Sequence, residues 1–147
     1  MADFTFVTAR LATGAAISSQ ADVDALVAAG ITHCIDCRIE FDDTPLLAGS
    51  GMAYLWNGTA DDGTHKGTAW FASSLTFALP MFTLPHTKLY CHCAAGVNRG
   101  PSTAYACMQA LGWSAADAEA AIRAARPQVG LAYKGDADAA VAALGYA

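Results

Sequence analysis

One short segment of the chain carries the residue types that phosphate chemistry needs. It reads His92-Cys93-Ala94-Ala95-Gly96-Val97-Asn98-Arg99. A thiolate is a strong nucleophile, and a nearby cation or a helix N-terminus lowers the pKa of a cysteine thiol. The planar fork of an arginine matches two phosphate oxygens. Cys93 and Arg99, at the two ends of one loop, therefore predict phosphoryl transfer to sulfur, followed by hydrolysis of a cysteinyl-phosphate.

The residues between Cys93 and Arg99 suit a loop that binds an anion through its backbone. Ala94, Ala95 and Gly96 are small, so the main chain can approach a ligand closely, and glycine takes a positive φ at little cost. Val97 and Asn98 complete the loop. Successive N–H groups in such a loop can converge on an oxyanion, and the N-terminus of a following helix adds positive potential.

A strand and a helix must position this loop. Residues 88–92 predict a strand before it, and Pro101, a favourable first-turn residue, starts a predicted helix over residues 101–111. Ligand sites in α/β sheets lie at the carboxyl ends of strands. The loop is therefore expected at such an end.

The rest of the chain alternates between strand and helix patterns. Strands are predicted at 4–7, 31–36 and 52–56, with loops at 40–51 and 57–67. Helices are predicted at 21–29, capped by Ser18 or Ser19, at 114–125 and at 136–144. Another starts near residue 71, and Pro80 should kink or end it. The alternation predicts a single α/β domain over residues 1–147, with a central, mainly parallel sheet flanked by helices and the phosphate loop between a central strand and a helix.

Composition excludes several classes of function. The chain has 147 residues, a net charge of −5 and only 8 lysines and arginines, so no extended nucleic-acid interface is expected. No stretch approaches the ~20 apolar residues that span a bilayer, and the N-terminus lacks a signal-peptide pattern. Five cysteines, an odd number, indicate reduced thiols. A cytoplasmic protein without a membrane partner is therefore expected.

The order His-Cys, five residues, then Arg resembles the signature of the cysteine-based protein tyrosine phosphatase superfamily. Size and order of elements are most similar to its small dual-specificity branch. The resemblance implies that Cys93 attacks phosphorus, that the amides of residues 94–99 and Arg99 bind phosphate, and that His92 helps to hold the loop. It implies no metal and no cofactor. The implied substrate is a phosphorylated protein or a small phosphomonoester, with phosphotyrosine foremost and phosphoserine or phosphothreonine as further possibilities.

Members of this superfamily also use an aspartate on a separate loop as the general acid. Asp61 and Asp62 both match its usual place, after a strand and ahead of the cysteine. The spacing to the cysteine in small dual-specificity members favours Asp61, and Asp62 stays an alternative. Geometry decides between them, because a general acid must reach the leaving oxygen.

The chain departs from the family pattern directly after the arginine. The family usually has Ser or Thr there, whose hydroxyl supports the sulfur as it leaves in the second step, but this chain has Gly100. Ser102 or Thr103 could replace that hydroxyl. If neither reaches the cysteine, hydrolysis of the intermediate is slow, and a catalytically weak phosphate-binding module becomes the alternative function. Gly96-x-Asn98-Arg99 also resembles RNA 5′-triphosphatase relatives, a reading that the acidic chain disfavours.

Other polar residues have two readings each. Cys34-x-x-Cys37 and Cys91-x-Cys93 could suggest zinc. However, Cys34 and Cys91 fall inside predicted buried strands, where alternate residues point to opposite faces. By resemblance, Cys37 is placed to form a disulfide with Cys93 on oxidation. His65 and Lys66, in the loop at 57–67, are interpreted as surface residues, with contact to the substrate as the alternative.

Overall fold

A five-stranded sheet forms the centre of the computed structural model, which describes residues 2–146. The strand order is β1-β2-β5-β3-β4, with β5 in the middle. β1 pairs antiparallel with β2, and all other neighbours are parallel. The predicted mainly parallel sheet is therefore confirmed. The strands are β1 (Phe4–Thr8), β2 (Leu11–Gly14), β3 (His33–Arg38), β4 (Ala53–Thr59) and β5 (Leu89–His92).

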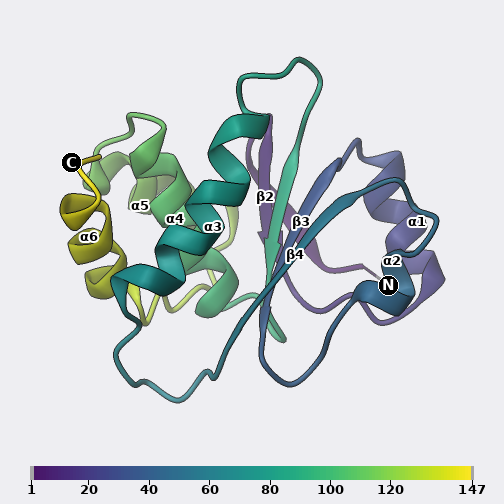
Figure 1. The fold of residues 1–147 in the computed structure, drawn as a ribbon, viewed down its shortest axis with the longest axis horizontal. Coiled ribbons are helices and arrows are strands. Elements are labelled where there is room, and N and C mark those ends of the chain that lie inside the picture. The colour runs from purple at the N-terminus through teal and green to yellow at the C-terminus, as the bar shows by residue number, and fades with distance from the viewer. Residues whose placement is uncertain (1, 147) are drawn as a thin grey trace.

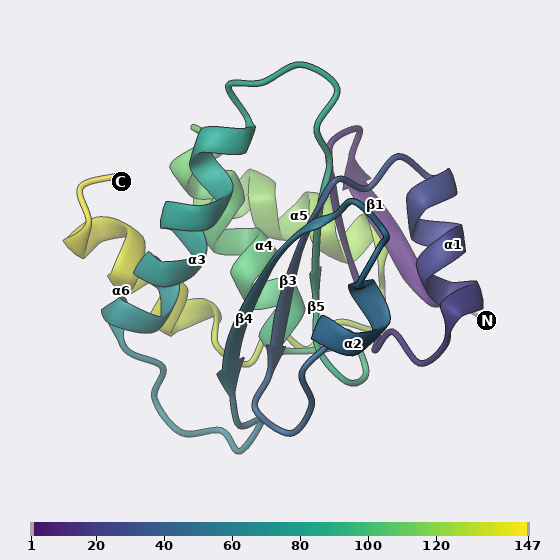
Figure 2. The same cartoon turned by 45° about the vertical axis from the view of Figure 1, so that its right-hand side comes forward.

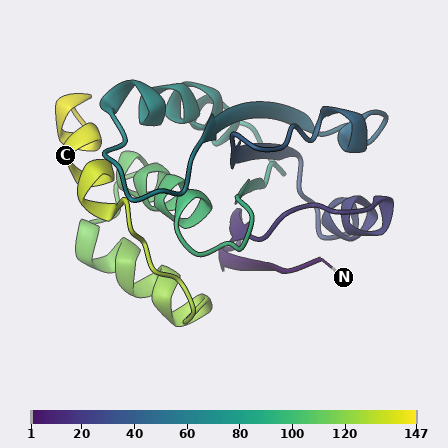
Figure 3. The same cartoon turned by 90° about the horizontal axis from the view of Figure 1, so that it is seen from below.

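Helices cover both faces of this sheet (Figures 1 and 2). Seen from below, the blue and purple helices lie on one side of the strands and the teal-to-yellow helices on the other (Figure 3). None of the helices within residues 2–146 is both long and apolar enough to cross a bilayer. The first group is α1 (Gln20–Ala28) and α2 (Thr44–Leu47), and the second is α3 (Thr68–Met81), α4 (Arg99–Ala110), α5 (Ala115–Ala125) and α6 (Lys134–Ala143).

Alternation along the strands divides the buried residues into two cores. Leu11, Ile35 and Cys91 belong to the larger core, which includes residues of α3, α4, α5 and α6. Their neighbours Ala12 and Tyr90 belong to the smaller core, which includes residues of α1 and α2. Successive side chains of a strand point to opposite faces, so one short strand such as β5 contributes to both cores.

Helix α4 is buried from Arg99 to Gln109. Neighbouring elements pack closely around a helix that is buried on all sides. Small residues such as Gly100, Ser102 and Ala104 leave room for this close packing. α4 packs against the sheet as well as against α3, α5 and α6. The N-terminus of α4, where Arg99 lies, is therefore fixed from several directions.

Most elements follow the sequence-based predictions. Ser19 caps α1, since its Oγ accepts a hydrogen bond from the Asp22 amide at 3.2 Å. α3 ends at Met81, directly after Pro80. Two elements were not predicted: β2, and the short α2 within the predicted loop at 40–51. β2 reads only Leu-Ala-Thr-Gly, so its strand identity comes from pairing with β1 and β5.

Candidate active site

Four parallel strands end at the same edge of the sheet, and a candidate site residue lies at each end. Gly14 is the last residue of β2, and Cys93 directly follows β5. Glu40 and Asp61 each come two residues after the end of β3 and β4. Figure 2 shows the arrowheads of β3 and β4 at the lower end of the sheet. This edge is where parallel α/β sheets place their ligands.

The phosphate loop, residues 93–99, is held against the end of β2. The Cys93 amide donates to the Gly14 carbonyl at 3.3 Å, and the Ala94 carbonyl accepts from the Ala16 amide at 3.0 Å. Gly96 has a φ of +67°, and a Cβ there would lie 2.5 Å from the carbonyl carbon of Gly14. Only glycine fits this close approach without strain.

Arg126 holds the phosphate loop in place through hydrogen bonds from its side chain to the loop carbonyls. Its side chain is 1% exposed. It donates to the carbonyls of Gly96 at 2.9 Å and Ala95 at 3.2 Å, and to the Asp3 carboxylate at 2.9 and 3.0 Å. Within residues 2–146, by contrast, the backbone amides of residues 94–98 donate to no protein acceptor. The loop therefore has its carbonyls occupied and a run of amides available to an anion.

Arg99 is held in one orientation by two acceptors. Its Nη1 donates to the Glu40 carboxylate at 2.7 Å and to the Thr59 carbonyl at 2.9 Å, and its Nη2 donates to Glu40 at 3.0 Å. The side chain is only 4% exposed. Its Nε is buried and has no hydrogen-bond partner within the described residues 2–146. An unpaired buried donor carries a desolvation cost that a bound anion would remove.

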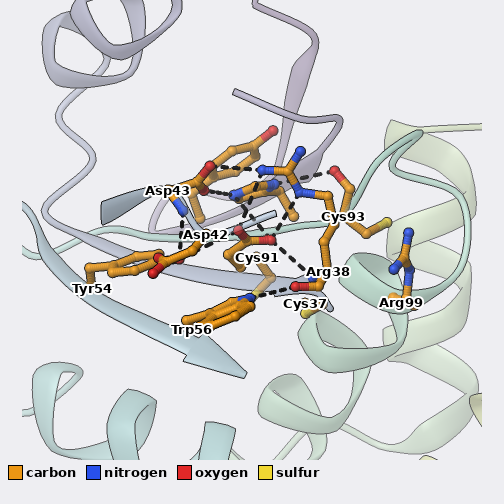
Figure 4. Close-up of polar contacts among 12 residues, drawn as sticks. Cys37, Arg38, Asp42, Asp43, Tyr54, Trp56, Cys91, Cys93 and Arg99 are labelled. Carbon is orange, nitrogen blue, oxygen red and sulfur yellow. Dashed lines mark hydrogen bonds and ion pairs between the residues drawn. The ribbon is translucent and has the colours of Figure 1, made fainter. Parts of the chain in front are cut away.

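Cys93 lies next to this guanidinium. Figure 4 shows the Cys93 sulfur directed toward the Arg99 side chain, and the cysteine is 2% exposed. Burial lowers the pKa of Arg99, but the bond to Glu40 and the negative charge of a Cys93 thiolate outweigh it and raise that pKa overall. The Cys93 sulfur and the Arg99 guanidinium thus lie in one site.

His92 belongs to a buried polar network with Asp43 and Arg38, two residues that are labelled in Figure 4. Its Nδ1 lies 3.2 Å from the Cys93 carbonyl oxygen, and its Nε2 lies 2.5 Å from an Asp43 oxygen. Arg38 bridges Asp43 at 2.7 Å and Asp36 at 3.1 Å. These side chains are 0 to 7% exposed. The histidine links this network to the backbone of the nucleophile.

Asp61 lies beside the phosphate loop. Asn98 of the loop donates from Nδ2 to both Asp61 oxygens at 3.3 and 3.4 Å, and the Tyr133 hydroxyl donates to one of them at 2.8 Å. The Asn98 Oδ1 accepts from the Ala132 amide at 3.1 Å, which fixes the amide group of Asn98. The carboxylate is therefore positioned at the loop by two donors.

Asp62 is engaged away from the loop. It accepts from the Thr64 hydroxyl at 2.6 Å, from the Thr64 amide at 3.0 Å and from the Lys66 ammonium at 3.0 Å. The Thr64 bonds, followed by the Lys66 contact, lower the pKa of Asp62 well below its usual range. A carboxyl with so low a pKa is rarely protonated, so it is a poor general acid. The geometry favours Asp61.

The hydroxyls that could assist Cys93 do not bind it. The Ser102 Oγ is buried and has no hydrogen-bond partner within residues 2–146. The Thr103 Oγ1 lies 3.4 Å from the Cys37 sulfur. At Gly100, a Cβ would lie 2.9 Å from the His92 Cα and 3.0 Å from the Cys91 carbonyl oxygen. Glycine at this position is therefore enforced by the backbone of β5.

The zinc reading finds little support among the described residues. Donor atoms of Cys34, Asp43 and His92 lie within 4.8 Å of one another. This set differs from the paired cysteines of the sequence pattern, and His92 and Asp43 already bond each other. Arg38 also contacts Asp43, and a cation disfavours a metal ion.

Sequence reasoning missed four residues that contact the site machinery: Glu40, Asp43, Arg126 and Tyr133. The position of Glu40 just after a predicted strand could have suggested it, since carboxyl ends of parallel strands meet. The interpretation of Lys66 as a surface residue was wrong. Its side chain is 5% exposed, because its ammonium lies over the Tyr133 ring at 4.9 Å and pairs with Asp62.

The sequence matches no family model and no curated protein. Solved structures, however, match over nearly the whole chain. PTPMT1 in complex with PI(5)P superposes with a TM-score of 0.79 at 18% identity, covering 97% of this chain and 99% of that one. The chain has the fold of the small dual-specificity phosphatases.

Two further structures with the dual-specificity phosphatase fold agree. Human DUSP28 matches with a TM-score of 0.75 at 19% identity, covering 98% of this chain and 96% of that one. The human tyrosine phosphatase-like serine/threonine/tyrosine-interacting protein matches with a TM-score of 0.79 at 18% identity, covering 98% and 99%. The fold that the resemblance implied is therefore confirmed, whereas activity and substrate must be argued from the site.

Proposed function

We propose that the protein hydrolyses phosphomonoesters through a cysteinyl-phosphate intermediate on Cys93. The observation that carries this proposal is the state of Arg99: a buried guanidinium, held by Glu40 and Thr59, whose Nε has no partner within residues 2–146. Beside it lie the Cys93 sulfur and the backbone amides of residues 94–98, which donate to no acceptor in the described part of the chain. A tetrahedral oxyanion supplies the acceptors that these donors lack.

In the first step, the Cys93 thiolate attacks phosphorus and forms the S–P bond. The bond to the leaving oxygen breaks, and Asp61 delivers a proton to that oxygen. In the second step, water attacks phosphorus while the Asp61 carboxylate accepts a proton from it. The S–P bond breaks, inorganic phosphate forms and the thiolate returns. Arg99 and the loop amides stabilise the charge of the transferring group in both steps.

Phosphotyrosine, with or without phosphoserine and phosphothreonine, is the substrate class that we infer. The chain has no large insertions to deepen the site, since each strand end is followed by a short loop. The complex of PTPMT1 with PI(5)P makes a phosphoinositide the principal alternative phosphomonoester.

A second function, phosphate binding with little turnover, is favoured by one observation. Gly100 carries no hydroxyl, and neither Ser102 nor Thr103 bonds the Cys93 sulfur. Without such a donor the thiolate leaves less readily, and the intermediate accumulates. One structural neighbour is the human tyrosine phosphatase-like serine/threonine/tyrosine-interacting protein.

Turnover of p-nitrophenyl phosphate by the wild type, Cys93→Ser and Asp61→Asn tests the proposal. We expect no turnover in Cys93→Ser and a loss of about 10²-fold in Asp61→Asn, the usual contribution of a general acid. Asp117→Asn, on the exposed first turn of α5, is the charge-matched control. Wild-type rates in Cys93→Ser would overturn the mechanism. A rapid burst of p-nitrophenol followed by slow turnover would support the second function.

A further inference from the structure

Within residues 2–146, two of the eight lysines and arginines act at the phosphate loop: Arg99, its last residue, and Arg126, which donates to the carbonyls of Gly96 and Ala95. Of these two, Arg99 keeps a buried donor, its Nε, that has no hydrogen-bond partner among the described residues. Arg126 lies beneath the loop and pairs with Asp3, and Arg38 pairs with buried carboxylates. The others are engaged with nearby carboxylates or with groups of other elements: Arg10, Lys66, Lys88, Arg123 and Lys134.

Negative charges, by contrast, flank the loop. Glu40 contacts Arg99, and its side chain is 51% exposed. Asp61, which holds a proton in the first step proposed above and is a carboxylate in the second, contacts Asn98 and is exposed. Asp62, the next residue, is 49% exposed and is partly neutralised by Lys66. We call Glu40, Asp61 and Asp62 the acidic rim.

The loop itself adds no charge that could offset this rim. Its exposed residues, Ala94 and Ala95, and the half-buried Val97 are uncharged. In this site, Arg99 and the loop amides bind the phosphate dianion. Any further charged group of the substrate lies next to the acidic rim. Carboxylates or phosphates near the reacting phosphate are repelled there, and ammonium or guanidinium groups are attracted.

We propose that the site selects phosphotyrosine segments whose flanking residues are lysine or arginine. This inference rests on the proposed phosphatase function and names the substrate class within it. Two observations carry it together: the buried Arg99 Nε, which has no partner within residues 2–146 and favours an anion in the loop, and the acidic rim, which favours cationic groups in the rest of the ligand. Carriers with several negative charges, such as an RNA 5′ end or a phosphoinositide headgroup in a membrane, are disfavoured.

Three phosphotyrosine peptides that differ only in their flanking residues test the proposal. With arginine, glutamine or glutamate on both sides, kcat/KM should fall in that order. At about 0.02 M ionic strength we expect at least about tenfold between the extremes, shrinking to about threefold or less at about 0.5 M, because salt screens exposed charges. Equal values, or a preference for the glutamate peptide, would overturn the proposal. So would a higher kcat/KM for phosphoinositide vesicles or for a 5′-triphosphorylated RNA than for the arginine peptide.

A pair of charge-matched variants assigns the effect to the rim. Glu40→Gln should reduce the ratio between the arginine and glutamate peptides by about threefold, whatever it does to the absolute rates. Asp117→Asn removes the same charge from the exposed first turn of α5 and should leave the ratio unchanged. A ratio that Glu40→Gln does not reduce would exclude the rim as its cause.

The outcomes separate this inference from the proposed function. If p-nitrophenyl phosphate is turned over in a Cys93-dependent way but the peptides show no charge order, only the selectivity fails. If nothing is turned over, the hydrolase proposal fails, and fluorescence anisotropy of the same peptides on Cys93→Ser still measures the charge order as dissociation constants. The same order there would support selectivity in a binding module, and its absence would overturn it.

Discussion

The Glu40 carboxylate accepts hydrogen bonds from both terminal nitrogens of Arg99, at 2.7 and 3.0 Å. A bidentate pair of this kind restricts the rotation of the guanidinium plane, and the buried Nε has no hydrogen-bond partner among the described residues. The arginine is thus oriented before a ligand arrives, which reduces the ordering cost of binding.

This pair should make stability depend on acidity. The Arg99 hydrogen bond lowers the pKa of Glu40 from its ordinary 4.5 to about 2. A carboxyl with a depressed folded-state pKa stabilises the fold fully above its unfolded pKa, and that contribution is lost as pH falls toward the folded value. Thermal unfolding of wild type and Glu40→Gln should therefore differ most above pH 4.5 and converge toward about pH 2. A constant difference across that window would contradict the assignment.

Restoring a hydroxyl after the arginine should harm this protein. Gly100→Ser places a Cβ 2.9 Å from the His92 Cα, so β5 or α4 must move. We expect a loss of about 1–3 kcal/mol in the free energy of unfolding, typical of overpacking, and no increase in kcat. Gly135→Ser is the matched control, because nothing lies within 4 Å of a Cβ there. A faster enzyme of unchanged stability in urea unfolding would show that position 100 has room.

Tyr133 positions the Asp61 carboxylate. Its hydroxyl donates to Asp61 at 2.8 Å and accepts from the Gly63 amide at 3.0 Å. It therefore connects the loop that carries Asp61 with the start of α6. Tyr133→Phe should lower kcat on phenyl phosphate about tenfold and affect p-nitrophenyl phosphate less, because a good leaving group needs less protonation. Tyr105→Phe removes a comparable buried tyrosine hydroxyl, which donates to Asp138. Equal losses on both substrates would indicate a merely structural role.

Asp43 should be among the most sensitive residues for stability. It is fully buried and accepts from Arg38 at 2.7 Å, while its other oxygen lies 2.5 Å from the His92 ring. Asp43→Asn leaves Arg38 with less compensation, and removing one partner of a buried pair costs about 3–5 kcal/mol. Asp42→Asn, a less buried neighbour, should cost about 1 kcal/mol or less. Urea unfolding compares the two, and similar losses would argue against the network.

Oxidation should join Cys37 to Cys93. Burial, and less strongly the nearby Cys93, raise the pKa of Cys37, so the Cys37 thiol stays protonated. Peroxide would convert the Cys93 thiolate to a sulfenic acid, and the Cys37 thiol would then condense with it to give a disulfide and water. Mass spectrometry after peroxide treatment should show the link and its reversal by dithiothreitol. Cys37→Ser should instead accumulate sulfinic acid at Cys93, and Cys107→Ser should behave as wild type. A wild-type protein without the link would remove the hypothesis.

The phosphate loop could be predicted because its information is local. A cysteine, small residues and an arginine occur within one loop. The strand before this loop and the helix after it each have their own sequence signal. The position of the preceding strand narrowed the candidates for the general acid to two neighbouring residues, Asp61 and Asp62. Asp61 stays the preferred candidate because it contacts Asn98 of the phosphate loop, whereas Asp62 pairs with Lys66 of its own loop.

The supporting residues could not be predicted because their roles are long-range. Arg126 and Tyr133 lie well after the loop in the sequence, and they reach the site only because α5 and α6 pack around α4. β2 was missed for the same reason: four residues with no strong pattern become a strand only when β1 and β5 lie on either side. Local propensity is silent about such pairings.

The side chain of Arg126 connects the first residues of the described chain to the phosphate loop. Besides two loop carbonyls, this buried guanidinium contacts Asp3, and it donates to the Thr5 hydroxyl of β1 at 3.1 Å. Removing the first few residues would leave the positive charge of Arg126 without the Asp3 carboxylate, next to the loop that follows Cys93. Purification tags and fluorescent fusions are consequently better attached after α6, where Tyr146 is exposed and no such tie exists among the described residues.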